Sequence, residues 1–134
     1  MTDDSTMPPP PPPEQPSQPQ GQQPSGSNDN TMATVAHATV VTGFLIPLIV
    51  WLIGKDQNPF VDAEGKKALN FSILITIAYV VSAVLGVIPF IGWLLGTLIW
   101  LAAVAVGLIF GIQGAVAANK GQPYKYPFTI DLVK

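Results

Sequence analysis

The residues able to do chemistry gather in one short polar segment, "KDQNPFVDAEGKKALNF", which runs from Lys55 to Phe71. It contains three carboxylates, of which Asp62 and Glu64 lie two residues apart and are followed, after Gly65, by Lys66 and Lys67. Carboxylates that lie two residues apart on a helix do not face each other, so the spacing does not favour paired acid–base catalysis. The two acids are oxygen ligands of the kind that binds cations, but the adjacent lysines neutralise the site. We therefore expect neither a catalytic site nor a metal site in this segment.

His37 is the only histidine in the chain. An ionisable group inside a membrane segment is a functional hypothesis by default. His37 lies about one turn inside an apolar run that begins at Met32, and the apolar runs contain no carboxylate that could exchange a proton with it. We expect an interfacial, neutral histidine, no catalytic residue, no cofactor and no enzymatic activity. Because the chain has no cysteine, disulfides and thiolate metal sites are excluded.

The elements around the polar segment are strongly apolar. Charged residues make up 10% of the chain, against about 25% in ordinary soluble domains. No charged residue occurs from Thr31 to Gly54 or from Ala68 to Asn119. A membrane-spanning helix needs about 20 apolar residues, and one charge at its centre costs about 2.5–3.5 kcal/mol. The sequence therefore predicts an all-α integral membrane protein rather than a soluble domain.

The apolar runs predict three transmembrane helices, over about 32–53, 69–88 and 93–118, within a membrane domain that covers 32–134. The short "GVIPFIGW" link makes the second and third helices antiparallel, and Gly121 with Pro123 predicts the end of the third. Pro47 is expected to kink the first helix. The alternative is that Pro47 marks a re-entrant segment that never crosses the membrane.

The first 31 residues are rich in Pro, Gln, Ser and Gly and predict a disordered tail, with polyproline II favoured over Pro8–Pro13. Two functions of this tail are consistent with its composition: a solvated spacer, or a ligand that binds in an aromatic groove of another protein. It lacks the positive start of a signal peptide.

The polar segment is expected to form a short amphipathic connector at the membrane surface. Asn58 and Pro59 predict a helix start, with Asp62 as a rival start. Asp62 and Lys66 are spaced for an ion pair along a helix, and the two lysines favour anionic lipid.

All six lysines follow the first apolar run, in the connector and after the third helix. With three crossings, the positive-inside rule places the N-terminus outside and the C-terminus in the cytoplasm. With a re-entrant first segment, both termini would lie in the cytoplasm.

Two further patterns concern helix packing and the C-terminus. Small residues recur every four positions along the third helix, at Ala103, Gly107, Gly111 and Ala115. Such a ridge lets helices approach closely, either within the chain or between copies and partners. The C-terminal "YKYPFTIDLVK" alternates apolar and polar residues, which favours an extended segment at the interface or against the edge of a partner's sheet.

Two polar motifs, "NPFVDAEGKKALNF" and "NKGQPYKYPFTIDLV", resemble those of a widespread bacterial family of small membrane proteins. That family is grouped with the Tic-twenty subunit of the chloroplast inner-envelope import channel. The resemblance covers 32–134 and implies a helical protein of the bacterial plasma membrane, although the chloroplast protein is described with four helices. The matching residues are Asn58, Pro59, Phe60, Val61, Asp62, Gly65, Lys66, Ala68, Leu69, Asn70, Gly121, Tyr124, Tyr126, Pro127 and Ile130.

The resemblance implies a non-enzymatic membrane subunit, in protein translocation or envelope assembly. Its partners would be the lipid bilayer and a protein partner or a second copy of the chain, with no nucleic acid and no small-molecule substrate. The alternative function is a small homo-oligomeric channel or transporter built through the small-residue ridge. The candidate contact residues are Phe60, Asp62, Lys66, Lys67, Asn70, Tyr124 and Tyr126.

Overall fold

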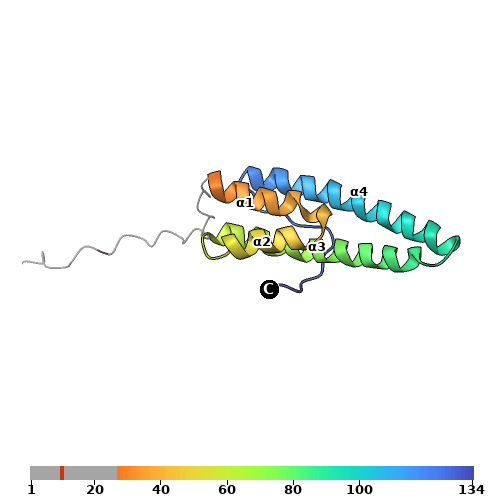
Figure 1. The fold of residues 1–134 in the computed structure, drawn as a ribbon. Coiled ribbons are helices and arrows are strands. Elements are labelled where there is room, and N and C mark those ends of the chain that lie inside the picture. The colour runs from red at the N-terminus through yellow and green to blue at the C-terminus, as the bar shows by residue number, and fades with distance from the viewer. Residues whose placement is uncertain (1–9, 11–26) are drawn as a thin grey trace, which may run out of the picture.

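The computed structural model describes Pro10 and residues 27–134, and the latter are built from helices without strands. Figure 1 shows the arrangement of these elements. The helices are α1 (Ser27–Ala38), the 3-10 helix η1 (Val40–Thr42), α2 (Leu45–Gly54), α3 (Pro59–Gly86) and α4 (Ile91–Asn119). After α4, a C-terminal segment (residues 120–134) returns along the helices without regular structure. The predicted all-α fold is confirmed for residues 27–134.

Helices α3 and α4 form a long antiparallel hairpin, and α1 and α2 form a short hairpin beside one end of it (Figure 1). Among residues 27–134, α3 and α4 are the two helices long and apolar enough to cross a membrane. At about 1.5 Å per residue, each exceeds the ~30 Å thickness of a hydrocarbon core. Many of their large apolar side chains face outward, including Val84, Leu98 and Ile112. Outward-facing apolar surface on long helices is suited to lipid.

The predicted continuous helix over 32–53 is wrong. The helix is interrupted at Gly43, which has φ 101°, and α2 runs back along α1 in the opposite direction. The left-handed region is open to glycine because it lacks a Cβ. Pro47 lies in the first turn of α2, where a missing N–H leaves no helical bond unmade. With 10 residues, α2 is about 15 Å long, so it cannot span a bilayer.

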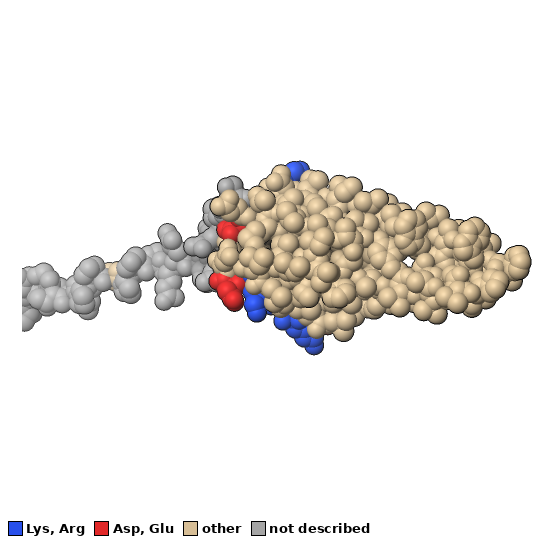
Figure 2. Space-filling model, viewed as in Figure 1, with Lys and Arg blue, Asp and Glu red and all other residues tan. Residues whose placement is uncertain are grey.

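This reversal matches the re-entrant alternative for the first apolar segment. The start of α1, the α2–α3 connection and the end of α4 all lie at one end of the molecule (Figure 1). The prediction that the two termini lie on opposite sides of a membrane depended on three crossings and is therefore not supported. Figure 2 shows charged side chains at this end, which we call the polar end, and none toward the α3–α4 turn.

Several predicted helix ends are confirmed. The side chain of Asn58 accepts a hydrogen bond from the Phe60 N–H at 2.7 Å, so it caps α3 with Pro59 in the first turn. The predicted connector is therefore the first part of one continuous helix. At the end of α4, Gly121 has φ 70°, and its N–H and that of Gln122 bond back to the helix. This pattern is the Schellman ending that the glycine predicts.

The predicted boundary between tail and membrane domain differs from the structure. Helix α1 begins at Ser27, so residues 27–31 are helical rather than part of a disordered tail. The rest of the Pro-rich tail, apart from Pro10, lies outside the described residues.

Candidate functional site at the polar end

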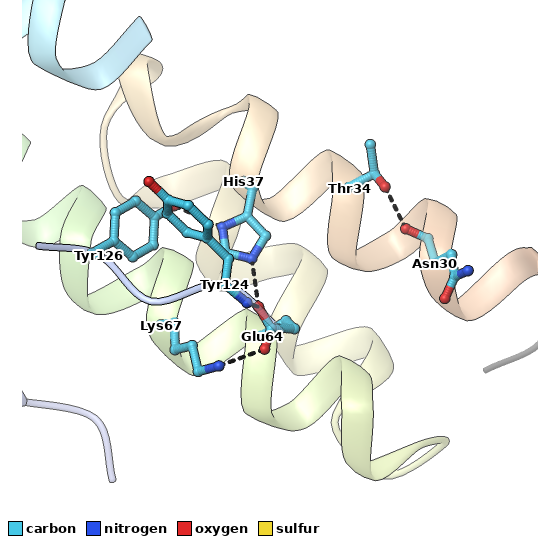
Figure 3. A network of polar contacts seen from close by, with 7 residues as sticks. All are labelled: Asn30, Thr34, His37, Glu64, Lys67, Tyr124 and Tyr126. Atoms are coloured by element: carbon cyan, nitrogen blue, oxygen red, sulfur yellow. Dashed lines mark hydrogen bonds and ion pairs between the residues drawn. The ribbon is translucent and has the colours of Figure 1, made fainter. Parts of the chain in front are cut away.

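The polar end contains a buried hydrogen-bonded network centred on His37 of α1 and Glu64 of α3 (Figure 3). His37 Nε2 lies 3.0 Å from Glu64 Oε2, and both side chains have 0% exposure. His37 Nδ1 lies 2.7 Å from the hydroxyl oxygen of Tyr126 in the C-terminal segment. One histidine thus joins three parts of the chain that are far apart in sequence.

Glu64 accepts two further hydrogen bonds. Lys67 Nζ donates to Oε1 at 2.6 Å, and the backbone N–H of Tyr124 donates to Oε2 at 3.0 Å. A carboxyl group that accepts from three donors is favoured in its ionised form. The lysine is partly exposed and connects the buried carboxylate to the surface. We call His37, Glu64, Lys67, Tyr124 and Tyr126 together the His37 network.

The proton positions in this network follow from the partners. The ionised carboxylate of Glu64 can only accept, so Nε2 of His37 carries the hydrogen that is donated to it. Burial raises the pKa of Tyr126 well above its usual range, so its hydroxyl group stays protonated where it bonds to His37 Nδ1. The ring of Tyr126 also stacks on Phe71, with centroids 4.1 Å apart and 15° between the planes. His37 is therefore a fully buried member of a hydrogen-bonded network, and the prediction that it has no carboxylate partner is wrong, whereas its position at the membrane interface stays a prediction.

Helix α4 makes room for this network with glycines. A Cβ on Gly114 would lie 2.6 Å from His37 Nδ1, and one on Gly111 would lie 2.9 Å from the backbone oxygen of His37. A Cβ on Gly107 would lie 3.2 Å from the Cα of Val41, in the α1–α2 hairpin. In the predicted small-residue ridge, Gly107 and Gly111 thus pack inside the chain. The two remaining members are Ala103, which is buried, and Ala115, which is half-buried.

Asn70 fixes the end of the C-terminal segment to α3. Its Oδ1 accepts from the N–H groups of Leu132 and Val133 at 3.1 and 2.7 Å, and its Nδ2 donates to the Val133 carbonyl at 2.9 Å. Asn70 itself is buried. The two polar motifs that stand far apart in the sequence are therefore in contact with each other.

The remaining predicted contact residues lie around the start of α3. Phe60 is buried in a small cluster with Ala33 and Ala118, which joins α3 to α1 and α4. Asp62 accepts from Trp51 Nε1 at 2.8 Å and forms the predicted ion pair with Lys66 at 2.8 Å. Asp62 and Lys66 are partly exposed. The structure therefore places Phe60, Asn70 and Tyr126 inside the chain and leaves the charged members at its surface.

The hydrogen bonds of this network hold α1, α3 and the C-terminal segment together. Among residues 27–134, no three His, Asp or Glu side chains gather closely enough to hold a metal ion. Among the described residues, the hydroxyl group that bonds to His37 is the phenol of Tyr126, and the side chain of His37 has no solvent access. Sequence reasoning missed the pairing because His37 and Glu64 are 27 residues apart. Glu64 was assigned to an exposed connector, and no local pattern signals its partner.

The family comparison corrects the resemblance. The model of the MamF/MmsF family, described as the magnetosome magnetite crystal formation protein family, matches residues 28–133. No curated protein and no solved structure matches the chain. The family with which the chain aligns is thus not the one related to the chloroplast Tic-twenty subunit, and that assignment is wrong. The predicted role in translocation depended on it and loses its support.

Proposed function

Because the chain belongs to the magnetosome magnetite crystal formation protein family, we propose that it is a non-enzymatic membrane protein that acts in forming magnetite crystals. The observation that carries the membrane part of this proposal is the segregation of charge. The charged residues from 27 to 134 gather at the polar end, whereas α3 beyond Lys67 and α4 have none (Figure 2). A charge-free hairpin of two long helices is suited to a bilayer, and a charged end is suited to its surface.

In this proposal, α3 and α4 cross the membrane as a hairpin, and the α1–α2 hairpin enters the bilayer and returns. The six lysines then lie on one side, which the positive-inside rule assigns to the cytoplasm. Both termini, and with them the Pro-rich N-terminal residues, lie on that side.

The polar end is the proposed working surface of the protein. The His37 network and Asn70 hold α1, α3 and the C-terminal segment in one fixed arrangement. Asp62, Lys66, Lys67 and Tyr124 remain at least partly exposed there, so a protein partner or a second copy of the chain would contact these residues. Phe60, Asn70 and Tyr126 would support that surface from within.

The topology can be tested with single cysteines, because the chain has none of its own. We would place them at Asn28 and Lys134, at the polar end, and at Gly86, which is exposed near the α3–α4 turn. With an impermeant maleimide, Gly86→Cys should react in intact spheroplasts, whereas N28C and K134C should react only after lysis. If N28C reacted in intact spheroplasts and K134C reacted only after lysis, the two termini would lie on opposite sides of the membrane. That result would support three crossings and contradict the hairpin.

The role in crystal formation needs a separate test. Removal of the chain from a magnetite-forming host should change the size or number of the crystals seen by electron microscopy, and the wild-type chain should restore them. Unchanged crystals would contradict the proposed role even if the topology were correct.

A further inference from the structure

The first turns of α3 and the C-terminal segment enclose a cleft of ≈ 320 Å³ at the polar end. Lys66 and Lys67 line it from α3, and Lys125, Thr129 and Asp131 line it from the C-terminal segment. The hydrogen bonds of Asn70 to Leu132 and Val133 hold the two walls together. The cleft is therefore a built feature of the fold.

The lining of the cleft is rich in donors and carries more positive than negative charge. Its lining residues include three lysines and Thr129, against one acidic residue, Asp131. Lys66 and Lys67 are held by Asp62 and Glu64, at 2.8 and 2.6 Å. Each bond uses one of the three N–H groups of an ammonium and leaves the others for a ligand. These ion pairs position the two lysines at the cleft.

Lys125 supplies the least compensated charge. It is exposed, and it forms no ion pair within residues 27–134. An anion in the cleft would meet it together with the fixed lysines of α3, from two sides.

The depth of the cleft also points to a ligand. Lys66 and Lys67 are the last charged residues before the charge-free part of α3. If that part lies in the hydrocarbon core, as the proposed function requires, the cleft lies at the level of the lipid phosphates. Its position, donors and charge agree on one class of ligand.

We propose that this cleft binds a phosphoryl anion through Lys66, Lys67 and Lys125. The phosphodiester of an anionic phospholipid and free phosphate share this chemistry, and the cleft is suited to either source. This inference rests on the proposed function in one respect only, which is the depth of the cleft in the membrane.

The test uses the full chain purified in detergent and titrated with phosphatidylglycerol, with bound lipid counted by native mass spectrometry. Since one lysine near an anionic headgroup contributes about 1 kcal/mol, Lys125→Gln should weaken binding about fivefold. Lys120→Gln is the matched control, because it removes the same charge from the polar end but does not line the cleft. Asp131→Asn should strengthen binding, by about two- to fivefold.

Inorganic phosphate distinguishes the two sources. If millimolar phosphate displaces the lipid, the proposed site is supported and recognises the phosphoryl group without the rest of the lipid. Lys125-dependent lipid binding that phosphate does not displace would support it with phospholipid as the ligand. Equal binding by wild type, K125Q and K120Q, or no effect of D131N, would overturn the proposal. Because the measurement is made in detergent, a failure here is separate from a failure of the topology test.

Discussion

The imidazole of His37 and the carboxylate of Glu64 lie 3.0 Å apart with no solvent access to either side chain. This contact joins the first hairpin to α3, and the same carboxylate accepts from the backbone of Tyr124 in the C-terminal segment. A buried carboxylate is stable only when its lone pairs are satisfied. The pair therefore holds α1, α3 and the C-terminal segment together at the polar end.

Removal of either partner should destabilise the polar end. His37→Ala and Glu64→Gln should each lower the free energy of unfolding by about 2–4 kcal/mol, because each leaves buried polar groups without partners. Chemical unfolding in detergent micelles would measure the loss. Thr97→Val is the control, because the Thr97 hydroxyl group is exposed and bonds only within its own helix. In the double variant the losses should fall short of additive by about 1–3 kcal/mol, and strict additivity would contradict the direct contact.

Gly114 should be intolerant of a side chain. A Cβ there would lie 2.6 Å from His37 Nδ1, so Gly114→Ala should cost about 1–3 kcal/mol through overpacking. Gly86→Ala is the matched control, because a Cβ at Gly86 meets nothing within 4 Å. Thermal unfolding of the two variants in the same detergent would compare them. Equal stability of G114A and wild type would show that α4 does not pack closely against His37.

Asn70 should control the mobility of the C-terminus. Asn70→Leu removes three hydrogen bonds to Leu132 and Val133, so amide hydrogen exchange over residues 131–134 should become faster. Gln113→Ala serves as the control, since Gln113 accepts only an exposed bond from the Tyr124 hydroxyl group. Unchanged exchange in N70L, measured by mass spectrometry, would mean that other contacts hold the segment.

The phenol of Tyr126 should make the fold sensitive to alkali. Burial raises the pKa of Tyr126 above its ordinary value of 10.0, so the folded chain favours the protonated hydroxyl group. Its contribution to stability is complete below about pH 10 and is lost as the pH rises further, because the unfolded chain then ionises first. Wild type should lose more stability than Tyr126→Phe between about pH 9 and pH 12.

All other ionisable groups are the same in the two proteins, so the difference between wild type and Y126F isolates the phenol of Tyr126. Y126F should also be less stable at neutral pH, by about 1 kcal/mol, because it loses the hydrogen bond to His37. Parallel pH profiles for the two proteins would exclude a buried, protonated phenol.

Much of the fold was predictable from local chemistry. The Asn58 cap, the Asp62–Lys66 pair and the glycine ending of α4 depend on neighbours within a few residues, and the structure has all three. The contact between the two polar motifs was not predictable, although both motifs were singled out. Their partners, such as Asn70 and Val133, are 63 residues apart.

The order of apolar and charged residues along the chain predicted the two long apolar helices α3 and α4 and the charged end, although it also predicted a third long helix that the structure does not have. A charge in hydrocarbon costs several kilocalories per mole wherever the chain folds, so this pattern constrains every possible structure. The reversal of the first apolar segment at Gly43 could not be predicted locally, because the contacts at the turn come from distant parts of α3, such as Thr76 bonding to the Phe44 N–H and Tyr79 to the Val41 carbonyl. The pairing of Glu64 with His37 is of the same kind, because its energy exists only once α1, α3 and the C-terminal segment have met.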